Sequence, residues 1–382
     1  MRHIYLDVLC AIGDNAKRRV LTSGSMEYAR DVALQQNRTS MDLVENIANV
    51  LTKIKLRAGK LGELGLGMEK ALRDVADVDA LEHHIKALAE DDTKVVVLID
   101  DLDLGWDNSD TANTMLLGLL LAADHIASLH ANLHPVIFLR EDVYTILIGR
   151  TMHADKYRNI ERIRWNKDSL IEVLEARINH NRRMAGLNEI VDAFNTVFTP
   201  SIGATHTQNW LIERTLSRPR ELIQLVRYYT EKVDGITPSD EKLKDAEPDY
   251  SNWKLDDLCA EYTNQYPALN SVMAFWKTKF FRRKYHFKRT EIEEMILQIF
   301  IEATINVPWF NALADAVDVR RFLDILYEIG FIGDFILGGQ GGSRTYYSYE
   351  ESHEPRFDEV QIHPCFRRAV NTVERIRESS AH

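Results

Sequence analysis

Apolar and polar positions change most sharply in residues 94–107, which read KVVVLIDDLDLGWD. Five apolar residues, Val95 to Ile99, stand in a row, and three acids follow at Asp100, Asp101 and Asp103. An apolar run of this length without polar alternation predicts a strand buried on both faces, as in the centre of a parallel sheet. Because ligands of such sheets bind beyond the carboxyl ends of the strands, these acids lie where a ligand is expected.

A second apolar run, His134 to Leu139, ends in Arg140, and a long apolar helix is predicted between the two runs at 112–129. This order predicts two parallel strands joined by a helical crossover. Arg140 would then lie at the same edge of the sheet as the acids. Two interpretations of Arg140 stay open: a group that senses a phosphate, or an ion pair with Glu141, Asp142 or the acids after the first strand.

Helical spacing of apolar residues predicts most of the remaining elements. Helices are expected at 40–55, at 68–90 with a break at 78–79, and at 169–181, 191–197, 208–216 and 221–233. A strand is expected at 160–165, and the glycine-rich stretch 59–67 is expected to be a flexible loop. Residues 234–257 contain one glycine, two prolines and many acids, which predicts a linker with little core of its own.

The last hundred residues predict a second fold. Three helices at 290–303, 308–317 and 319–329, followed by two strands at 331–337 and 344–350 around a glycine-rich turn, indicate a winged helix. A basic and aromatic segment, Phe281 to Arg289 (FRRKYHFKR), comes just before it. Contact of this segment with nucleic-acid phosphates is one interpretation, and a role of the fold in packing or in binding a protein partner is the other.

The composition is that of an ordinary soluble globular protein, since 45% of the 382 residues are apolar, 27% are charged and the net charge is −11. The length predicts two or three domains. The acidic balance argues against a surface that binds nucleic acid throughout, although it allows a local basic patch. Three widely spaced cysteines predict a reducing, cytoplasmic environment. The longest apolar stretch, at 115–123, is too short to predict a membrane span.

The acids after the first strand have the chemistry of a magnesium–nucleotide site. Asp100 would hold Mg²⁺, and Asp101 would orient or deprotonate an attacking water. An acidic turn after a buried strand is the alternative, because aspartate is common in turns and helix caps. The phosphate loop GxxxxGK[ST] does not occur in the sequence, and its nearest string, at 58–61, lacks the final hydroxyl residue.

Several strings in this order resemble bacterial P-loop ATPases near the KAP and STAND groups of the AAA+ class. They are VVVLIDDLDLGWDNSDTAN, VIFLREDVY, HADKYRNIERIRW, SRPRELIQLVR and IHPCFRRAV. The resemblance implies ATP and Mg²⁺ as cofactors, with Asp100 and Asp101 as the Walker B acids and Arg140 as sensor 1. It also implies Arg218 or Arg220 as sensor 2, for which two solvated arginines at a helix start are the alternative. The first strand and the Walker A lysine of such proteins have no counterpart in this sequence.

Together these patterns predict an α/β fold with a truncated P-loop ATPase parallel-sheet core at 1–166, a helical lid at 167–234, a linker with connecting helices at 235–275 and a C-terminal winged-helix domain at 276–382. The expected function is an ATP-binding and ATP-hydrolysing regulatory switch in bacterial defence. We expect it to be inactive unless a Walker A loop is supplied, and to act with a protein partner or as a homo-oligomer without membrane association. The alternative is a non-catalytic module that binds protein or DNA.

Overall fold

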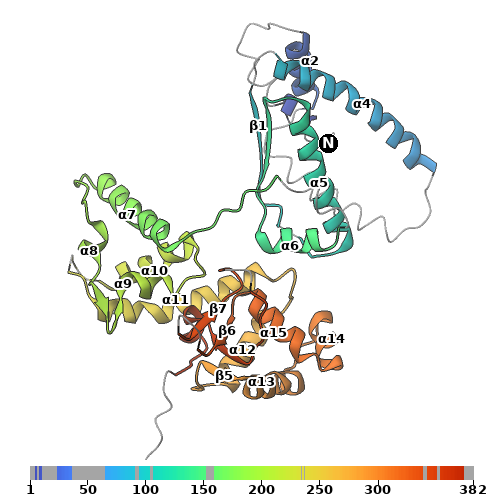
Figure 1. Cartoon of the computed structure of the whole chain (residues 1–382). Coiled ribbons are helices and arrows are strands. Elements are labelled where there is room, and N and C mark those ends of the chain that lie inside the picture. Colours follow the sequence, from blue (N-terminus) through green and yellow to red (C-terminus); the bar gives the residue numbers. More distant parts are fainter. Residues whose placement is uncertain are drawn as a thin grey trace, which may run out of the picture. The chain divides into compact units, whose positions relative to one another are not determined.

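A computed structural model describes residues 5–6, 8–10, 24–36, 65–90, 94–103, 106–151, 159–233, 235, 237–338, 342–350 and 353–373. The chain divides into two compact units, Met1–Arg162 and Ile163–His382, which we describe separately (Figure 1). The described part is a mixed α/β structure, mostly helical, with a two-stranded parallel sheet and a four-stranded antiparallel sheet among its strands. The helix predicted at 40–55 and most of the predicted loop at 59–67 lie outside the described residues.

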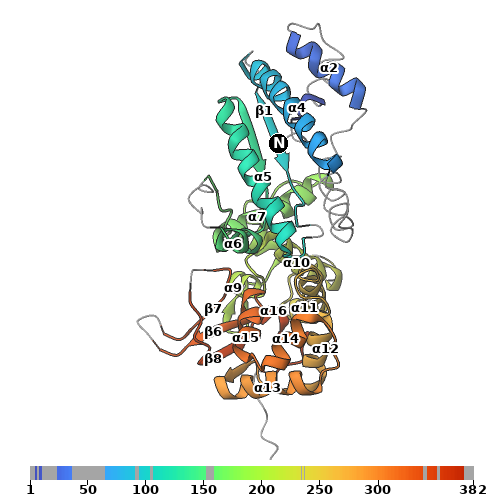
Figure 2. The same ribbon diagram turned by 90° about the vertical axis from the view of Figure 1, so that its right-hand side faces the viewer.

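Unit 1 contains the strand–helix–strand arrangement that the sequence predicts. Its elements are α2 (Gly24–Gln36), α4 (Gly65–Glu90), β1 (Val95–Ile99), α5 (Asp110–Leu129), β2 (Leu133–Ile137) and α6 (Glu141–Gly149). Strands β1 and β2 are parallel, in register from Val95 opposite Leu133 to Ile99 opposite Ile137. Helix α5, which Figure 2 labels, connects them and packs along β2, and this confirms the predicted crossover.

The two faces of this sheet differ, so the prediction of a strand buried on both faces is wrong. Val95, Val97 and Ile99 face the core that α4 and α5 form, and Ile99 is 1% exposed. On the opposite face Val96 is 54% exposed and Leu98 is 65% exposed. The unbroken apolar run suggested two covered faces, but alternate side chains of a strand point to opposite sides, and the described helices cover only one of them.

Three further details of unit 1 differ from the sequence predictions. Helix α4 runs without a break through 78–79, and residues 159–166 form neither helix nor strand, although a strand was expected at 160–165. By length and composition helix α5 could cross a bilayer, which the apolar stretch at 115–123 does not predict. No other described helix passes this test. Helix α5 packs on β2, and 28% of its most apolar window is buried, so its length and composition alone are weak evidence for a membrane span.

The first half of unit 2 is helical. Its elements are α7 (Lys167–Met184), α8 (Ala193–Val197), β3 (Ser201–Ile202), β4 (Thr205–His206), α9 (Thr207–Ile212), α10 (Pro219–Lys232) and α11 (Asp240–Glu261). Helix α11 corrects the predicted linker at 234–257, because it continues through Pro248 and buries Leu243, Tyr250 and Leu258. The acids that suggested a linker lie mostly on the exposed side of the helix, where their charges stay in water and do not destabilise the fold.

The second half of unit 2 adds α12 (Leu269–Lys279), β5 (His286–Lys288), α13 (Arg289–Glu302), α14 (Pro308–Ala316), α15 (Val319–Glu328), β6 (Ile332–Ile336), β7 (Arg344–Tyr346), β8 (Glu359–Ile362) and α16 (Pro364–Arg367). The three predicted helices are confirmed to within about one residue at each end, and the predicted hairpin β6–β7 is confirmed with shorter strands, since β7 ends at Tyr346 and not at Glu350. Strands β5 and β8 were not predicted, and they extend the antiparallel sheet to the order β5-β8-β6-β7.

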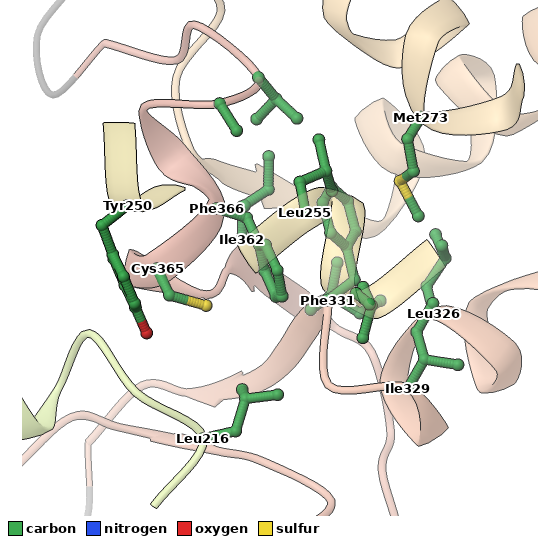
Figure 3. Packing of buried hydrophobic residues seen from close by; sticks show 14 of the residues in the cluster. Leu216, Tyr250, Leu255, Met273, Leu326, Ile329, Phe331, Ile362, Cys365 and Phe366 are labelled. Carbon is green, nitrogen blue, oxygen red and sulfur yellow. The ribbon is translucent and has the colours of Figure 1, made fainter. Parts of the chain in front are cut away.

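Both halves of unit 2 share one hydrophobic core. Figure 3 shows Tyr250 from the helical half beside Cys365 from the C-terminal half, and Leu216, Ile362 and Phe366 belong to the same cluster. Since one core spans both halves, we expect residues 163–382 to unfold as a single cooperative unit.

Candidate functional site

The acidic edge of β1 is the first candidate site. Directly after the strand, a carboxylate oxygen of Asp100 accepts a hydrogen bond from the backbone N–H of Asp101 at 2.8 Å. Asp101 has a φ of 58°, a left-handed conformation that aspartate tolerates better than most residues. Both side chains are exposed, whereas the next residue, Leu102, is buried and fixes the turn to the core.

The loop that follows the acidic turn is anchored by buried polar groups. The indole N–H of Trp106, a residue only 4% exposed, donates to the side-chain carbonyl of Asn113 at 2.9 Å. The amide nitrogen of Asn113 donates to the backbone carbonyl of Asn108 at 3.1 Å. Ser109 caps α5 by accepting from the N–H of Ala112. These bonds fix the entry into α5 next to the acids.

Arg140 follows β2 at the same edge, as the parallel order predicts. Its guanidinium donates to both carboxylate oxygens of Asp142, at 3.1 and 2.7 Å, and lies 3.5 Å from a carboxylate oxygen of Asp103. The structure therefore contains the ion pair that the sequence left open as the alternative for Arg140. It also brings Arg140 together with one of the three acids after β1.

The described part of this edge offers ligands for the magnesium ion of magnesium–ATP but no loop that holds its phosphates. Carboxylate oxygens are the ligands that Mg²⁺ prefers, and Asp100 and Asp101 offer them in exposed positions. Among the described residues, however, no three histidine, cysteine or acidic side chains are grouped so as to hold a metal ion. The sequence also has no glycine-rich phosphate loop to hold the triphosphate. The acids fit a hydrated Mg²⁺, and the phosphate ligands would come from another segment.

The two arginines predicted as sensor 2 lie at the start of α10 in unit 2. Arg218 precedes the first turn, and its guanidinium is 2.9 Å from Glu261. Arg220 is 78% exposed and lies 3.3 Å from Asp257. Both arginines thus pair with carboxylates at the end of α11 and are not isolated solvated side chains.

A buried ion pair lies beneath these arginines, and the sequence reading missed it. Lys254 of α11 is fully buried, and its ammonium lies 2.8 Å from Glu221, which is 2% exposed, and 3.1 Å from Asp257. A second oxygen of Glu221 accepts the backbone N–H of Leu216. Burial opposes the charge of Lys254, but the Glu221 carboxylate outweighs it, so that the pKa of Lys254 is raised above its ordinary value.

A second ionic group joins the helical half of unit 2 to its C-terminal half. Glu247 of α11, which is 4% exposed, accepts from Arg214 at 2.5 Å and from Arg368 at 3.0 Å. On the next turn of the helix, the hydroxyl of Ser251 donates to the backbone carbonyl of Cys365 and accepts from the N–H of Ala369. Helix α11 is therefore the element that fixes the two halves together.

A buried histidine completes this contact. The Nδ1 atom of His363 accepts the backbone N–H of Cys365 at 3.2 Å, and its Nε2 atom is 2.7 Å from the hydroxyl of Tyr349. Because a backbone N–H only donates, the ring proton of His363 is on Nε2. Burial, together with the nearby charge of Arg367, keeps the pKa of His363 well below its ordinary value, so this ring is neutral.

One family model and one curated relative match this chain. Residues 168–259 match a family described as the FunZ-associated C-terminal helical domain, which takes in α10 and nearly all of α11. The chain is 22% identical over 321 residues to the putative transposon gamma-delta 80.3 kDa protein of Escherichia coli (strain K12), covering 77% of this chain and 43% of that protein. This chain thus spans less than half the length of that relative. No solved structure matches, and no P-loop or AAA+ family does.

Proposed function

We propose that this chain belongs to a nucleotide-dependent regulatory switch of the AAA+ and STAND type. In this proposal the edge at β1 and β2 binds the magnesium ion of ATP, and residues 163–382 respond to the bound nucleotide. The observation that carries the proposal is the parallel pair β1 and β2, because it brings Asp100, Asp101 and Asp103 to one edge with Arg140. Parallel α/β sheets bind ligands at this edge.

Each residue of this edge has a distinct proposed role. Asp100 holds Mg²⁺ and Asp101 orients the attacking water in the hydrolysis of ATP to ADP and phosphate. Arg140 exchanges its pairing with Asp103 and Asp142 for the terminal phosphate. Since catalysis of this kind depends on positioning and charge neutralisation, turnover requires a Walker A loop, supplied by a longer form or by a second chain.

The fold of unit 2 fits the same proposal. Residues 167–234 would be the helical lid, with Arg218 and Arg220 released from their carboxylates when they contact nucleotide. The order of α13, α14, α15 and hairpin β6–β7 supports a winged helix at 276–382. We propose that the protein acts in the bacterial cytoplasm with a protein partner or as a homo-oligomer, in defence or, as the name of the transposon relative suggests, in connection with a mobile element.

The test is titration of a fluorescent ATP analogue into the full 382-residue chain with Mg²⁺, using Asp100→Ala and a control, Asp79→Ala, whose exposed side chain lies on α4. Because this chain supplies metal ligands but no phosphate loop, we expect weak binding of the analogue, which Asp100→Ala weakens further by at least about tenfold, since even indirect metal contacts contribute that much. Asp79→Ala should leave binding unchanged. Equal binding by all three proteins would contradict the assignment of Asp100.

A second candidate function is a non-catalytic interaction module on a degenerate ATPase core. One observation in its favour is the exposed apolar face of the sheet, where Val96 and Leu98 are more than half exposed. Another is that each arginine predicted to contact nucleotide, Arg140, Arg218 and Arg220, is paired with a carboxylate of the protein itself. Absence of ATP binding up to millimolar concentration would favour this candidate, because the acids would then lack a nucleotide to act on.

A further inference from the structure

The loop between α12 and β5 carries an unusual set of side chains for an acidic protein. We call Phe281, Arg282, Arg283 and Lys284 the basic loop, and all four side chains are exposed. The chain as a whole has a net charge of −11, so three successive cations here form a local field opposite in sign to that of the whole.

The cations of the basic loop differ from the other basic residues around them. Nearby, Lys279 lies 2.6 Å from Glu302 and Arg289 lies 3.1 Å from Asp358. Within the described ranges, by contrast, Arg282, Arg283 and Lys284 have no carboxylate within ion-pair distance. No carboxylate among the described residues neutralises their charge, which can therefore attract an external anion.

Helix α15 is the helix that a winged helix would present to DNA, and its arginines, unlike those of the basic loop, are paired with carboxylates. Arg320 lies 3.1 Å from Asp324, one turn further along the helix, and Arg321 donates to Glu328 at 2.6 Å. Half of the helix is buried in the core, including Phe322 and Leu326. Because its arginines are neutralised by the helix itself, α15 offers little attraction to a duplex backbone.

The backbone of the basic loop is held firmly. The N–H of Arg282 donates to the carbonyl of Asn371 at 3.0 Å, and the carbonyl of Arg283 accepts from the N–H of Val373 at 2.9 Å. Arg282 has a φ of 58°, which turns the chain sharply at this point. A loop fixed in this way loses little conformational entropy when it binds a ligand.

An aromatic ring lies among these cations. Phe281 is 54% exposed, whereas its neighbour Phe280 is 1% exposed in the core. The guanidinium of Arg282 lies 5.2 Å from the centre of the Phe281 ring. An exposed ring beside cations has the two features with which proteins bind unpaired bases and their phosphates.

We propose that the basic loop binds single-stranded nucleic acid. Arg282, Arg283 and Lys284 contact successive phosphates, and Phe281 stacks on an unpaired base. A duplex keeps its bases stacked inside the helix and would use only the cations, so single strands should bind more tightly. This proposal specifies the partner of the interaction module and does not depend on ATP, which is left out of its test.

The test measures binding of the full chain to a labelled single-stranded oligonucleotide of about 16 nucleotides, near the upper site size of one single-strand-binding fold. The first variant is Arg282→Glu with Arg283→Glu. Its matched control is Arg177→Glu with Lys242→Glu, which makes the same change in net charge at two exposed residues on α7 and α11. We expect the first variant to bind at least about tenfold more weakly and to have a shallower salt dependence, while the control stays near wild type.

A second variant, Phe281→Ala, tests the aromatic ring separately. It should weaken single-strand binding by about tenfold and leave duplex binding unchanged, because stacking requires an unpaired base. The proposal is overturned if the two double variants behave alike, if duplex binds as tightly as single strand, or if Phe281→Ala has no effect. Thermal unfolding of each variant confirms that the fold is intact, and Phe281, being exposed, is not needed for it.

Discussion

The charged residues singled out in the two units differ in their exposure to solvent. In unit 1 Asp100 and Asp101 are exposed, and Asp103, which is half-buried, pairs with Arg140. In unit 2 Lys254, Glu221 and Glu247 are buried, and each is paired with an opposite charge. A buried charge has to be compensated within the fold, whereas an exposed one is stabilised by water and stays available to a ligand. The contrast separates residues that stabilise the protein from residues that can act on a partner.

The largest effect is expected from Lys254→Met. Removing the ammonium leaves the Glu221 carboxylate buried, with Arg218, at 3.9 Å, as its one cationic neighbour in the described part of the chain. We expect unit 2 to lose about 3–5 kcal/mol in its free energy of unfolding, the usual result of breaking a buried pair. Urea unfolding followed by tryptophan fluorescence is suitable, because five of the six tryptophans lie in unit 2.

The control is Lys244→Met, which removes an exposed i,i+4 pair with Asp240 from the same helix. It should cost less than about 1 kcal/mol. If both lysine variants were equally stable, the distinction between buried and exposed charge would not hold for this protein.

An intermediate effect is expected from pH through His363. Its folded pKa lies below the ordinary value because the ring is buried, so below about pH 6.5 the unfolded chain binds a proton that the folded chain does not. The contribution of His363 to the free energy of unfolding is therefore complete above that pH. It decreases as the pH falls, by at most about 1.4 kcal/mol per pH unit.

The measurement compares urea midpoints of wild type and His363→Gln from about pH 7.5 to about pH 5.5, the range around the histidine pKa. Other groups contribute equally to both proteins, so the difference isolates His363. The variant should be less stable at neutral pH and should show a shallower decline. Parallel curves would mean that the ring accepts a proton in the folded state.

The smallest effect is expected on the exposed face of the sheet. Leu98→Ser should change stability by no more than about 0.5 kcal/mol, because the side chain is 65% exposed. The adjacent Ile99→Ala, at a position only 1% exposed, should cost about 2–5 kcal/mol. Thermal unfolding followed by circular dichroism measures both. A cost for Leu98→Ser close to that for Ile99→Ala would show that something covers this face in solution.

The local pattern of apolar residues predicted many of the helices and strands, but it did not predict the elements that depend on contacts between distant segments. Strand β1, helix α5 and helix α15 follow from apolar periodicity, which each segment carries by itself. Helix α11 was missed because Pro248 and many acids suggested a linker, although the burial of Tyr250 and Leu258 outweighs them. Strands β5 and β8 have only three and four residues, and they depend on pairing with each other across more than seventy residues.

The candidate site divides in the same way. That Asp100, Asp101 and Arg140 lie at one edge could be derived from the sequence, because parallel strands place their carboxyl ends together. The pairing of Arg140 with Asp142 was one of two interpretations that the sequence left open. The pairing of Arg218 with Glu261 and of Arg220 with Asp257 could not be derived from the sequence. Long side chains reach several possible partners, and only the packed backbone decides which of them is near.

The sequence by itself determined the periodic elements, the acidic edge of β1 and the position of the basic loop, since each depends on residues close together in the chain. Tertiary structure decided which face of the sheet is covered, which lysine is buried, and which cations have no carboxylate partner among the residues that the structure describes. These properties depend on the distance between segments far apart in sequence, such as Glu221 and Lys254, and on how completely each is removed from water.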